Sequence, residues 1–154
     1  MQLFTRLASL EERPFLFQVY ADTRKSEVNS WGWSEDQVKM FLQMQFDAQT
    51  RAYSSHPVPL KEEMIFYKDE PIGRILTREL GEVLVIVDIA LLSEFHNRGF
   101  GTELITCYQQ YAMEKGISIE LHVLSANPVC KLYKRLGFVL TGEHPLYLTM
   151  KWTP

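Results

Sequence analysis

The spacing of hydrophobic residues changes along the chain, and these changes predict where helices and strands lie. Two amphipathic stretches near the N-terminus repeat apolar residues every three or four positions, which is typical of helices packed on a core. Each begins with a capping spacing, Ser9 with Glu12 and Ser34 with Gln37, that favours the first turn of a helix. The second helix is predicted to run to about Tyr53, and the polar, glycine-containing stretch RKSEVNSWGW connects the two.

Beyond SSHPVPL, whose prolines end the helical region, the pattern becomes that of strands. The most apolar of them, VLVIVDIALL, is typical of a strand buried on both faces. Two further helices are predicted, one from about Gly101 to Lys115 that stops at Gly116, and a shorter one in NPVCKLYKRLGF. The expected strands are Gln2 to Leu7, Met64 to Tyr67, Ile72 to Thr77, Val83 to Leu92, ISIELHVL, FVLTGE and LYLTMKW.

This order of elements indicates an α/β (α+β) domain with a mixed central sheet flanked by helices. At 154 residues the chain is expected to form one domain, 1–154, with a core that needs no staples. A net charge of -3 gives no electrostatic case for nucleic acid or an anionic membrane. The two cysteines have neither disulfide-framework nor metal-ligand spacing, and no signal peptide or membrane-spanning run is apparent. We therefore expect a cytoplasmic protein without a metal.

Two glycines, Gly99 and Gly101, stand just before the predicted helix at Gly101 to Lys115. Glycine costs roughly 1 kcal/mol relative to alanine inside a helix, so the pair needs a reason. Glycines in such a loop let the free amides of a helix N-terminus approach a phosphate, and Arg98 would add charge. A tight turn without a ligand explains the glycines equally well. A Walker loop is absent, and Leu104 stands where a dinucleotide-binding loop needs its third glycine.

The loop His96-Asn97-Arg98-Gly99-Phe100-Gly101 resembles the phosphate loop of GNAT-type N-acetyltransferases, which reads Q/R-x-x-G-x-G/A after a strand. His96 stands in the place of the glutamine or arginine, and Arg98 offers a compensating charge. Family members also often carry an N-x-x-A-x-x-L-Y segment after the next strand, with G-F shortly afterwards. The residues taken as corresponding are Asn127, Cys130, Leu132, Tyr133, Gly137 and Phe138. The resemblance covers most of the chain and implies a single-domain acyl-CoA N-acyltransferase-like fold.

The resemblance implies that acetyl-CoA is the acetyl donor and that backbone groups hold it. Amides around Arg98 to Thr102 would bind the pyrophosphate, and the strand edge Ile89 to Leu92 would pair with the pantetheine arm. The Leu91 amide would bind the thioester oxygen, and Tyr133 would protonate the departing thiolate or merely pack. Asn127 would contact CoA or cap its helix. The expected cofactor-binding residues are Ile89, Ala90, Leu91, Leu92, His96, Asn97, Arg98, Gly99, Phe100, Gly101, Thr102 and Asn127.

Asp88 is the third candidate catalytic residue, after Tyr133 and Leu91, because it interrupts an apolar strand where an unpaired charge is costly. It would take a proton through water, bind the ammonium of the substrate, or pair with a structural donor. His122 is an alternative base, and direct attack by a neutral amine needs no side-chain base at all. Candidates for a wall around the acceptor, or for ordinary packing, are Trp31, Trp33, Tyr53 and the SSHPVPL segment.

The sequence therefore predicts an acetyl-CoA-dependent N-acetyltransferase that acts on a primary amine of a small molecule or peptide. Cys107 and Cys130 have no evident base partner, so an acyl-cysteine intermediate is not supported. The alternative is a non-catalytic acyl-CoA-binding or sensing module on the same fold. A homodimer is plausible for this type of fold.

Overall fold

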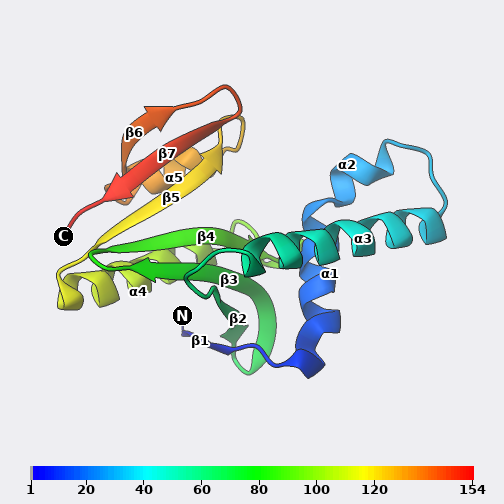
Figure 1. Cartoon of the computed structure of the whole chain (residues 1–154), viewed down its shortest axis with the longest axis horizontal. Coiled ribbons are helices and arrows are strands. Elements are labelled where there is room, and N and C mark those ends of the chain that lie inside the picture. The colour runs from blue at the N-terminus through cyan, green and yellow to red at the C-terminus, as the bar shows by residue number, and fades with distance from the viewer. Residues whose placement is uncertain (1) are drawn as a thin grey trace.

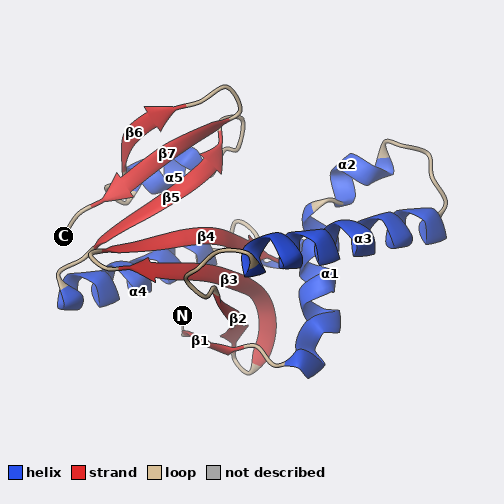
Figure 2. Ribbon diagram, viewed as in Figure 1, coloured by secondary structure: helices blue, strands red, loops and turns tan. Residues whose placement is uncertain are grey.

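The computed structural model describes residues 2–154, and its central feature is one seven-stranded mixed sheet flanked by helices (Figures 1 and 2). The strands lie in the order β1-β2-β3-β4-β5-β7-β6, and only β4 and β5 pair in parallel. This arrangement confirms the predicted fold class. The strands are β1 (Leu3–Leu7), β2 (Lys61–Tyr67), β3 (Glu70–Leu80), β4 (Val83–Leu91), β5 (Ser118–Leu124), β6 (Val139–Glu143) and β7 (Tyr147–Trp152). The helices are α1 (Arg13–Thr23), α2 (Lys25–Asn29), α3 (Glu35–Ser54), α4 (Phe100–Lys115) and α5 (Cys130–Arg135).

Both predicted capping spacings begin helical structure. The Ser9 amide donates to Glu12 Oε1 at 2.9 Å, and this contact opens a short 3-10 turn that continues into α1. The Ser34 hydroxyl accepts from the Gln37 amide at 3.2 Å, while the Gln37 side chain accepts from the Ser34 amide at 3.0 Å. One α-helix was not predicted: the polar stretch between these helices contains α2, a helix with a single buried side chain, Val28.

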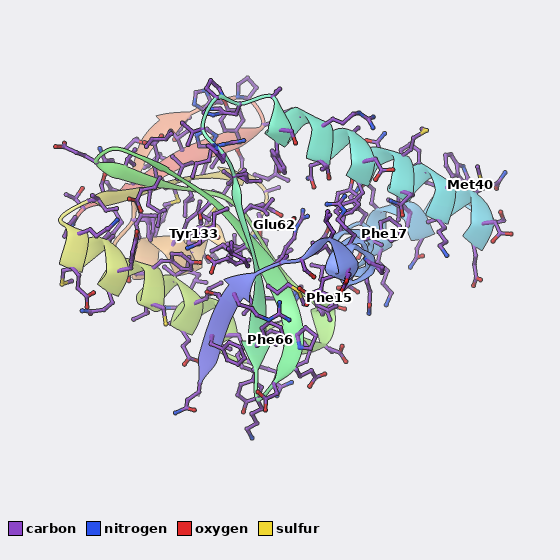
Figure 3. The ribbon with its side chains drawn as sticks, turned by 60° about the horizontal axis from the view of Figure 1, so that its bottom comes forward. Phe15, Phe17, Met40, Glu62, Phe66 and Tyr133 are labelled. Carbon is purple, nitrogen blue, oxygen red and sulfur yellow. The ribbon has the colours of Figure 1, made fainter. Side chains whose placement is uncertain are left out.

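Strand β3 is longer than its apolar pattern predicts, and both of its arginines find partners on one face of the sheet. The Arg78 guanidinium donates to the carbonyl oxygens of Val58 and Tyr53 at 3.0 and 2.7 Å. Arg74 contacts Gln49 of α3 in the same way, so α3 covers this face of β3. Thr77, between the arginines, lines a cavity together with side chains of α4, which lies along the opposite face of the sheet (Figure 3).

The hydrophobic core lies mainly between the sheet and α4. Its fully buried members include Ile75 of β3, Ile119 of β5 and Ile105 of α4. A second, smaller core of Leu16, Phe46, Met64 and Phe66 joins α1 and α3 to β2. The two cores hold the sheet between two helical layers, which fixes the positions of α1, α3 and α4 around the C-terminal end of β4.

Strands β4 and β5 separate in the middle of the sheet. Their parallel pairing joins Val83–Ile86 to Ser118–Leu121 and goes no further, although both strands continue. Figure 1 shows the two strands diverging from this point. Val87 lies in a bulge, since Asp88 pairs with Leu76 while Ile86 pairs with Thr77. The divergence exposes the backbone edge of the last residues of β4.

Candidate active site

The last residues of β4 present their backbone groups alternately to β3 and to the gap beside β5. The Leu92 amide donates to the Ile72 carbonyl oxygen at 2.8 Å, so Leu92 bonds toward β3. Ala90, two residues earlier, has the same direction, whereas Ile89 and Leu91 point into the gap. Of the four residues expected to hold the pantetheine arm, only Ile89 and Leu91 therefore have backbone groups free of the β3 ladder.

His96 joins the phosphate loop to the end of β4. Its Nε2 atom donates to the Leu91 carbonyl oxygen at 2.7 Å, which requires the tautomer with hydrogen on Nε2. The other side of the same loop is held by α1, because Asp22 accepts from the Ser93 amide at 2.8 Å and from the Ser93 hydroxyl at 3.1 Å. Two anchors thus fix where the loop turns into α4.

Helix α4 begins with backbone donors that no intrahelical acceptor uses. Its first intrahelical bond runs from the Glu103 amide to the Gly99 carbonyl oxygen at 3.1 Å, which leaves the amides of Phe100, Gly101 and Thr102 free of the helix ladder. The N-cap residue is Gly99, so within residues 2–154 no N-cap side chain accepts a hydrogen bond from these amides. The end of a 16-residue helix also carries partial positive charge, so the arrangement is suited to an anion.

The two loop glycines have different physical reasons. Gly99 has a φ of 85°, in the left-handed region that favours glycine, so the turn itself requires it. Gly101 has ordinary helical backbone, and a Cβ atom built there would lie 3.5 Å from Leu132 Cδ2, an ordinary contact. Packing within the protein therefore does not require glycine at position 101. A molecule that approaches this end of α4 from outside would instead require a small residue there, glycine or alanine.

Arg98 lies over the loop on two aromatic rings. Its guanidinium carbon is 5.3 Å from the centre of the Phe95 ring and 5.2 Å from that of Phe100. The side chain of Phe100 is buried, so this residue can offer a ligand only its backbone. Asn97, with a φ of 58°, supplies the sharp turn before Arg98. The exposed guanidinium and the free amides of α4 thus lie on the same loop.

Asp88 is paired, as one of its three expected roles required. The Arg74 guanidinium donates to Asp88 Oδ2 at 3.1 Å and to Gln49 Oε1 at 2.9 Å, and it lies 3.8 Å from Glu62 Oε2. Arg74 is only 2% exposed, whereas the Asp88 and Glu62 side chains are 35% and 29% exposed. The cluster therefore consists of one buried cation and two carboxylates that are partly accessible from the space in front of β4.

Arg74, Glu62 and Gln49 were not among the predicted site residues. The only signal in the sequence is the arginine inside the apolar run PIGRIL, since a charge buried in a strand must find partners. His122, the other base considered, is exposed and stacks on Tyr147 with ring centres 5.3 Å apart. Among the described residues, no histidine hydrogen-bonds Asp88.

Tyr133 of α5 is both packed and protonated. Its ring belongs to the main core, 5.7 Å from the Phe138 ring centre, and the residue is 8% exposed. Burial, and next the charge of Asp88 and then Cys130, raises the pKa of Tyr133 to about 12. The same carboxylate, after burial, helps to raise the pKa of Tyr53 on α3. Asp88 is thus electrostatically coupled to both tyrosines, and each phenol keeps its hydrogen at neutral pH.

Asn127 caps a turn rather than the helix itself, which corrects its predicted role as helix cap. Its Oδ1 atom accepts from the Val129 amide at 3.0 Å, and α5 begins at Cys130 with Val129 as its N-cap. Asn127 also departs from the family pattern, because it precedes Leu132 by five positions instead of six. The short asparagine turn takes the place of the first part of the helix.

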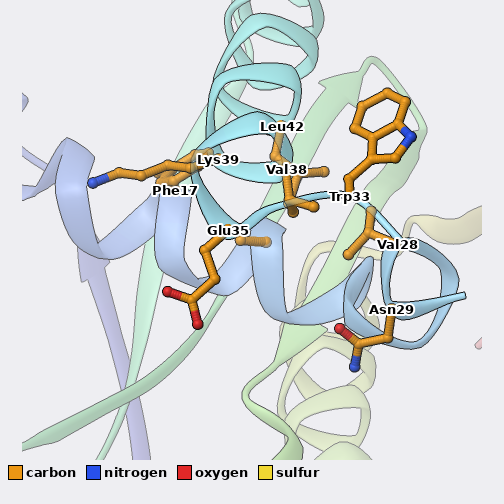
Figure 4. Close-up of a pocket in the computed structure, with 9 residues that line it drawn as sticks. Phe17, Val28, Asn29, Trp33, Glu35, Val38, Lys39 and Leu42 are labelled. Carbon is orange, nitrogen blue, oxygen red and sulfur yellow. The ribbon is translucent and has the colours of Figure 1, made fainter. Parts of the chain in front are cut away.

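The aromatic residues expected around the acceptor do not form one wall. Trp31 and Trp33 pack with Phe41 at the start of α3, and Trp33 lines a cavity of about 300 Å³ between α1, α2 and α3 (Figure 4). Tyr53 lies at the other end of α3, roughly 30 Å from Trp33 at the rise of an α-helix. Because one continuous helix separates them, Trp31 and Trp33 pack with Phe41 near one end of α3, while Tyr53 near the other end is influenced by the charge of Asp88.

Comparison with known proteins establishes the family and supports the fold. A family model for the acetyltransferase (GNAT) family matches residues 14–138. The chain belongs to this acetyltransferase family. The fold is similar to that of the PaiA N-acetyltransferase from Thermoplasma acidophilum in complex with coenzyme A, at 18% identity, a TM-score of 0.73 and full coverage of both chains. It is also similar to the ribosomal-protein-S18-alanine N-acetyltransferase from Escherichia coli, at 14% identity and a TM-score of 0.69 over 99% and 94% of the chains.

A mycothiol acetyltransferase from Corynebacterium aurimucosum is 39% identical over 70 residues, which is 44% of this chain. The match spans 22% of that relative, so it does not identify the acceptor. The family match thus indicates an acetyltransferase. Within residues 2–154, no helix is long and apolar enough to cross a membrane, and no three metal-ligating side chains are grouped.

Proposed function

We propose that residues 1–154 act as one N-acetyltransferase domain that transfers the acetyl group of acetyl-CoA directly to a primary amine. The observation that carries this proposal is the uncapped N-terminus of α4, which follows directly on the open edge of β4. Gly101 supports it, because the packing of the protein alone does not require a glycine there. Donor and acceptor would meet where β4 and β5 diverge.

The donor would be held by backbone groups and one arginine. The amides of Phe100, Gly101 and Thr102, together with Arg98, would bind the pyrophosphate, because they combine free donors with positive charge. Ile89 and Leu91 would pair with the pantetheine arm along the open edge. Since His96 already donates to the Leu91 carbonyl oxygen, the Leu91 amide is the group left for the donor.

The proposed chemistry uses the Leu91 amide, Tyr133 and Asp88. Bound acetyl-CoA supplies the thioester carbonyl; the amine nitrogen bonds to its carbon while the carbon–sulfur bond breaks. The Leu91 amide would donate to the carbonyl oxygen as charge develops there, and the loss of such a donor typically costs about 3 kcal/mol. Tyr133, whose pKa is about 12, would donate its hydrogen to the sulfur. The proton released by the nitrogen would pass toward Asp88 or water.

The acceptor subsite would be the space in front of Asp88, Glu62 and Arg74. Two partly exposed carboxylates around one guanidinium leave an excess of negative charge, which favours an amine that carries positive charge. Tyr53 would form one side of this space. The names of the relatives described above indicate different acceptors. The proposed preference for a positively charged amine therefore rests on this chain's own charges.

The direct test is calorimetric titration with acetyl-CoA, followed by measurement of free-thiol release with a panel of amines in the same preparation. Binding with amine-dependent thiol release supports the proposal, and faster release with positively charged amines supports the acceptor subsite. Binding without release by any amine favours the acyl-CoA-sensing alternative. Absence of binding by a folded, ligand-free sample contradicts the assignment of the α4 loop.

A further inference from the structure

A second cavity, of about 310 Å³, lies on the α4 face of the sheet and away from the proposed transfer site. Its walls come from β1, from the start of β2, from the end of β3 and from the middle of α4. It meets β4 at Leu84, whereas the transfer site uses Ile89 and Leu91, about 20 Å further along an extended strand. On α4 it begins one turn beyond Gly101, at Leu104. The proposed chemistry uses none of its lining side chains.

A buried carboxylate, Glu63, lines this cavity. Glu63 is 6% exposed, and its two oxygens accept from the Thr5 hydroxyl at 2.9 Å and from the Tyr108 hydroxyl at 3.0 Å. A carboxylate can accept about four hydrogen bonds, so acceptor capacity remains. Among residues 2–154 the cation that pairs with it is Lys61, whose Nζ lies 3.7 Å from Oε1, within ion-pair range but too far for a hydrogen bond, on a side chain that is 59% exposed.

The other carboxylate of the cavity is already neutralised. Glu79 accepts from Tyr111 and from Lys115 Nζ at 3.0 Å. Burial and the charge of Glu63 raise the pKa of Tyr108, so this phenol stays a hydrogen-bond donor to Glu63. The rest of the lining is largely apolar and includes Leu84 and Leu104. The cavity thus combines an apolar wall with one buried negative charge that lacks a hydrogen-bonded cation.

We infer that this cavity binds a small organic cation, an ammonium group on a compact apolar body, with its nitrogen beside Glu63. A buried charge is stabilised when a charged partner hydrogen-bonds it, and the ammonium would fill the acceptor positions that Lys61 does not reach. The volume equals about ten water molecules, which fits an aliphatic chain of a few carbons. This site goes beyond acetyl transfer and does not depend on it.

The test uses n-hexylammonium as probe, with 1-hexanol and hexanoate as its neutral and anionic counterparts, in the absence of acetyl-CoA. Cys107 lines the cavity and is exposed, so its alkylation by iodoacetamide reports occupancy when Cys130→Ser removes the other thiol. We expect hexylammonium to slow alkylation at concentrations at least tenfold below those needed for hexanol, and hexanoate to give no protection. Equal protection by hexylammonium and hexanol overturns the inference.

Three variants test whether hexylammonium binding depends on the negative charge of Glu63. Glu63→Gln keeps the shape and should raise the half-protective concentration of hexylammonium about tenfold or more, with that of hexanol unchanged. Lys61→Ala changes an exposed side chain and should lower that concentration; it serves if Glu63→Gln does not fold. Asp88→Asn alters the proposed acceptor subsite and should have no effect. An unchanged value in both of the first two variants, or an equal shift in Asp88→Asn, overturns the inference.

Discussion

Substitutions of Gly101 distinguish the effect of this position on folding stability from its effect on CoA binding. A Cβ atom at this position lies 3.5 Å from Leu132 Cδ2, so Gly101→Ala should fold without rearrangement. Alanine is favoured over glycine in a helix by up to about 1 kcal/mol, so this variant should melt up to about 2–4 °C higher. The loop pattern of the family admits either residue, so Gly101→Ala should keep its affinity for CoA and serve as the matched control.

Gly101→Val places two more methyl groups than Gly101→Ala beside the free amides at the start of α4. If these amides bind the pyrophosphate, the branched side chain should cost at least one charge-assisted hydrogen bond. Such a bond is worth about 1.5–3 kcal/mol, which corresponds to roughly a 10- to 150-fold weaker affinity for CoA. Calorimetric titration measures the affinity, and thermal melting by circular dichroism verifies the fold. A folded Gly101→Val protein that binds CoA as tightly as Gly101→Ala refutes the assignment of the loop.

Three further predictions concern the tyrosine and the buried charge cluster. Tyr133→Phe should leave CoA binding intact and lower kcat by about 10²-fold or more if proton donation limits turnover; equal turnover would assign Tyr133 to packing alone. Arg74→Met removes the hydrogen bonds that Arg74 donates to Asp88 and Gln49 and, because the Asp88 side chain left behind is 35% exposed, should lower the free energy of unfolding by about 1.5–3 kcal/mol in urea titrations; a loss below 1 kcal/mol would contradict the cluster's structural role. The pKa of Tyr133 is 10.0 in the unfolded chain and about 12 in the folded protein. Its contribution to the free energy of unfolding is therefore complete below pH 10 and declines by up to about 2.7 kcal/mol as the pH rises to 12. This alkaline decline should be smaller in Tyr133→Phe.

Local signals in the sequence determined much of the secondary structure. The capping pairs at Ser9 and Ser34 begin helical structure, and Gly116, with a φ of 68°, ends α4 as predicted. These features depend on contacts within about four residues along the chain, so the sequence can specify them without knowledge of the fold. The loop from His96 to Thr102 was found for the same reason, since its turn and helix N-terminus are local structures.

Contacts between distant segments decided the remaining parts of the candidate site. Glu62, Arg74 and Asp88 lie on three strands and meet only through the pairing of β2, β3 and β4. The pairing of β4 with β3 also sets which backbone groups at Ile89 and Leu91 face the gap. The length of α3 separates Trp33 from Tyr53. A strand's register and a helix's direction depend on what packs against them, and that information is spread over residues far apart in the sequence.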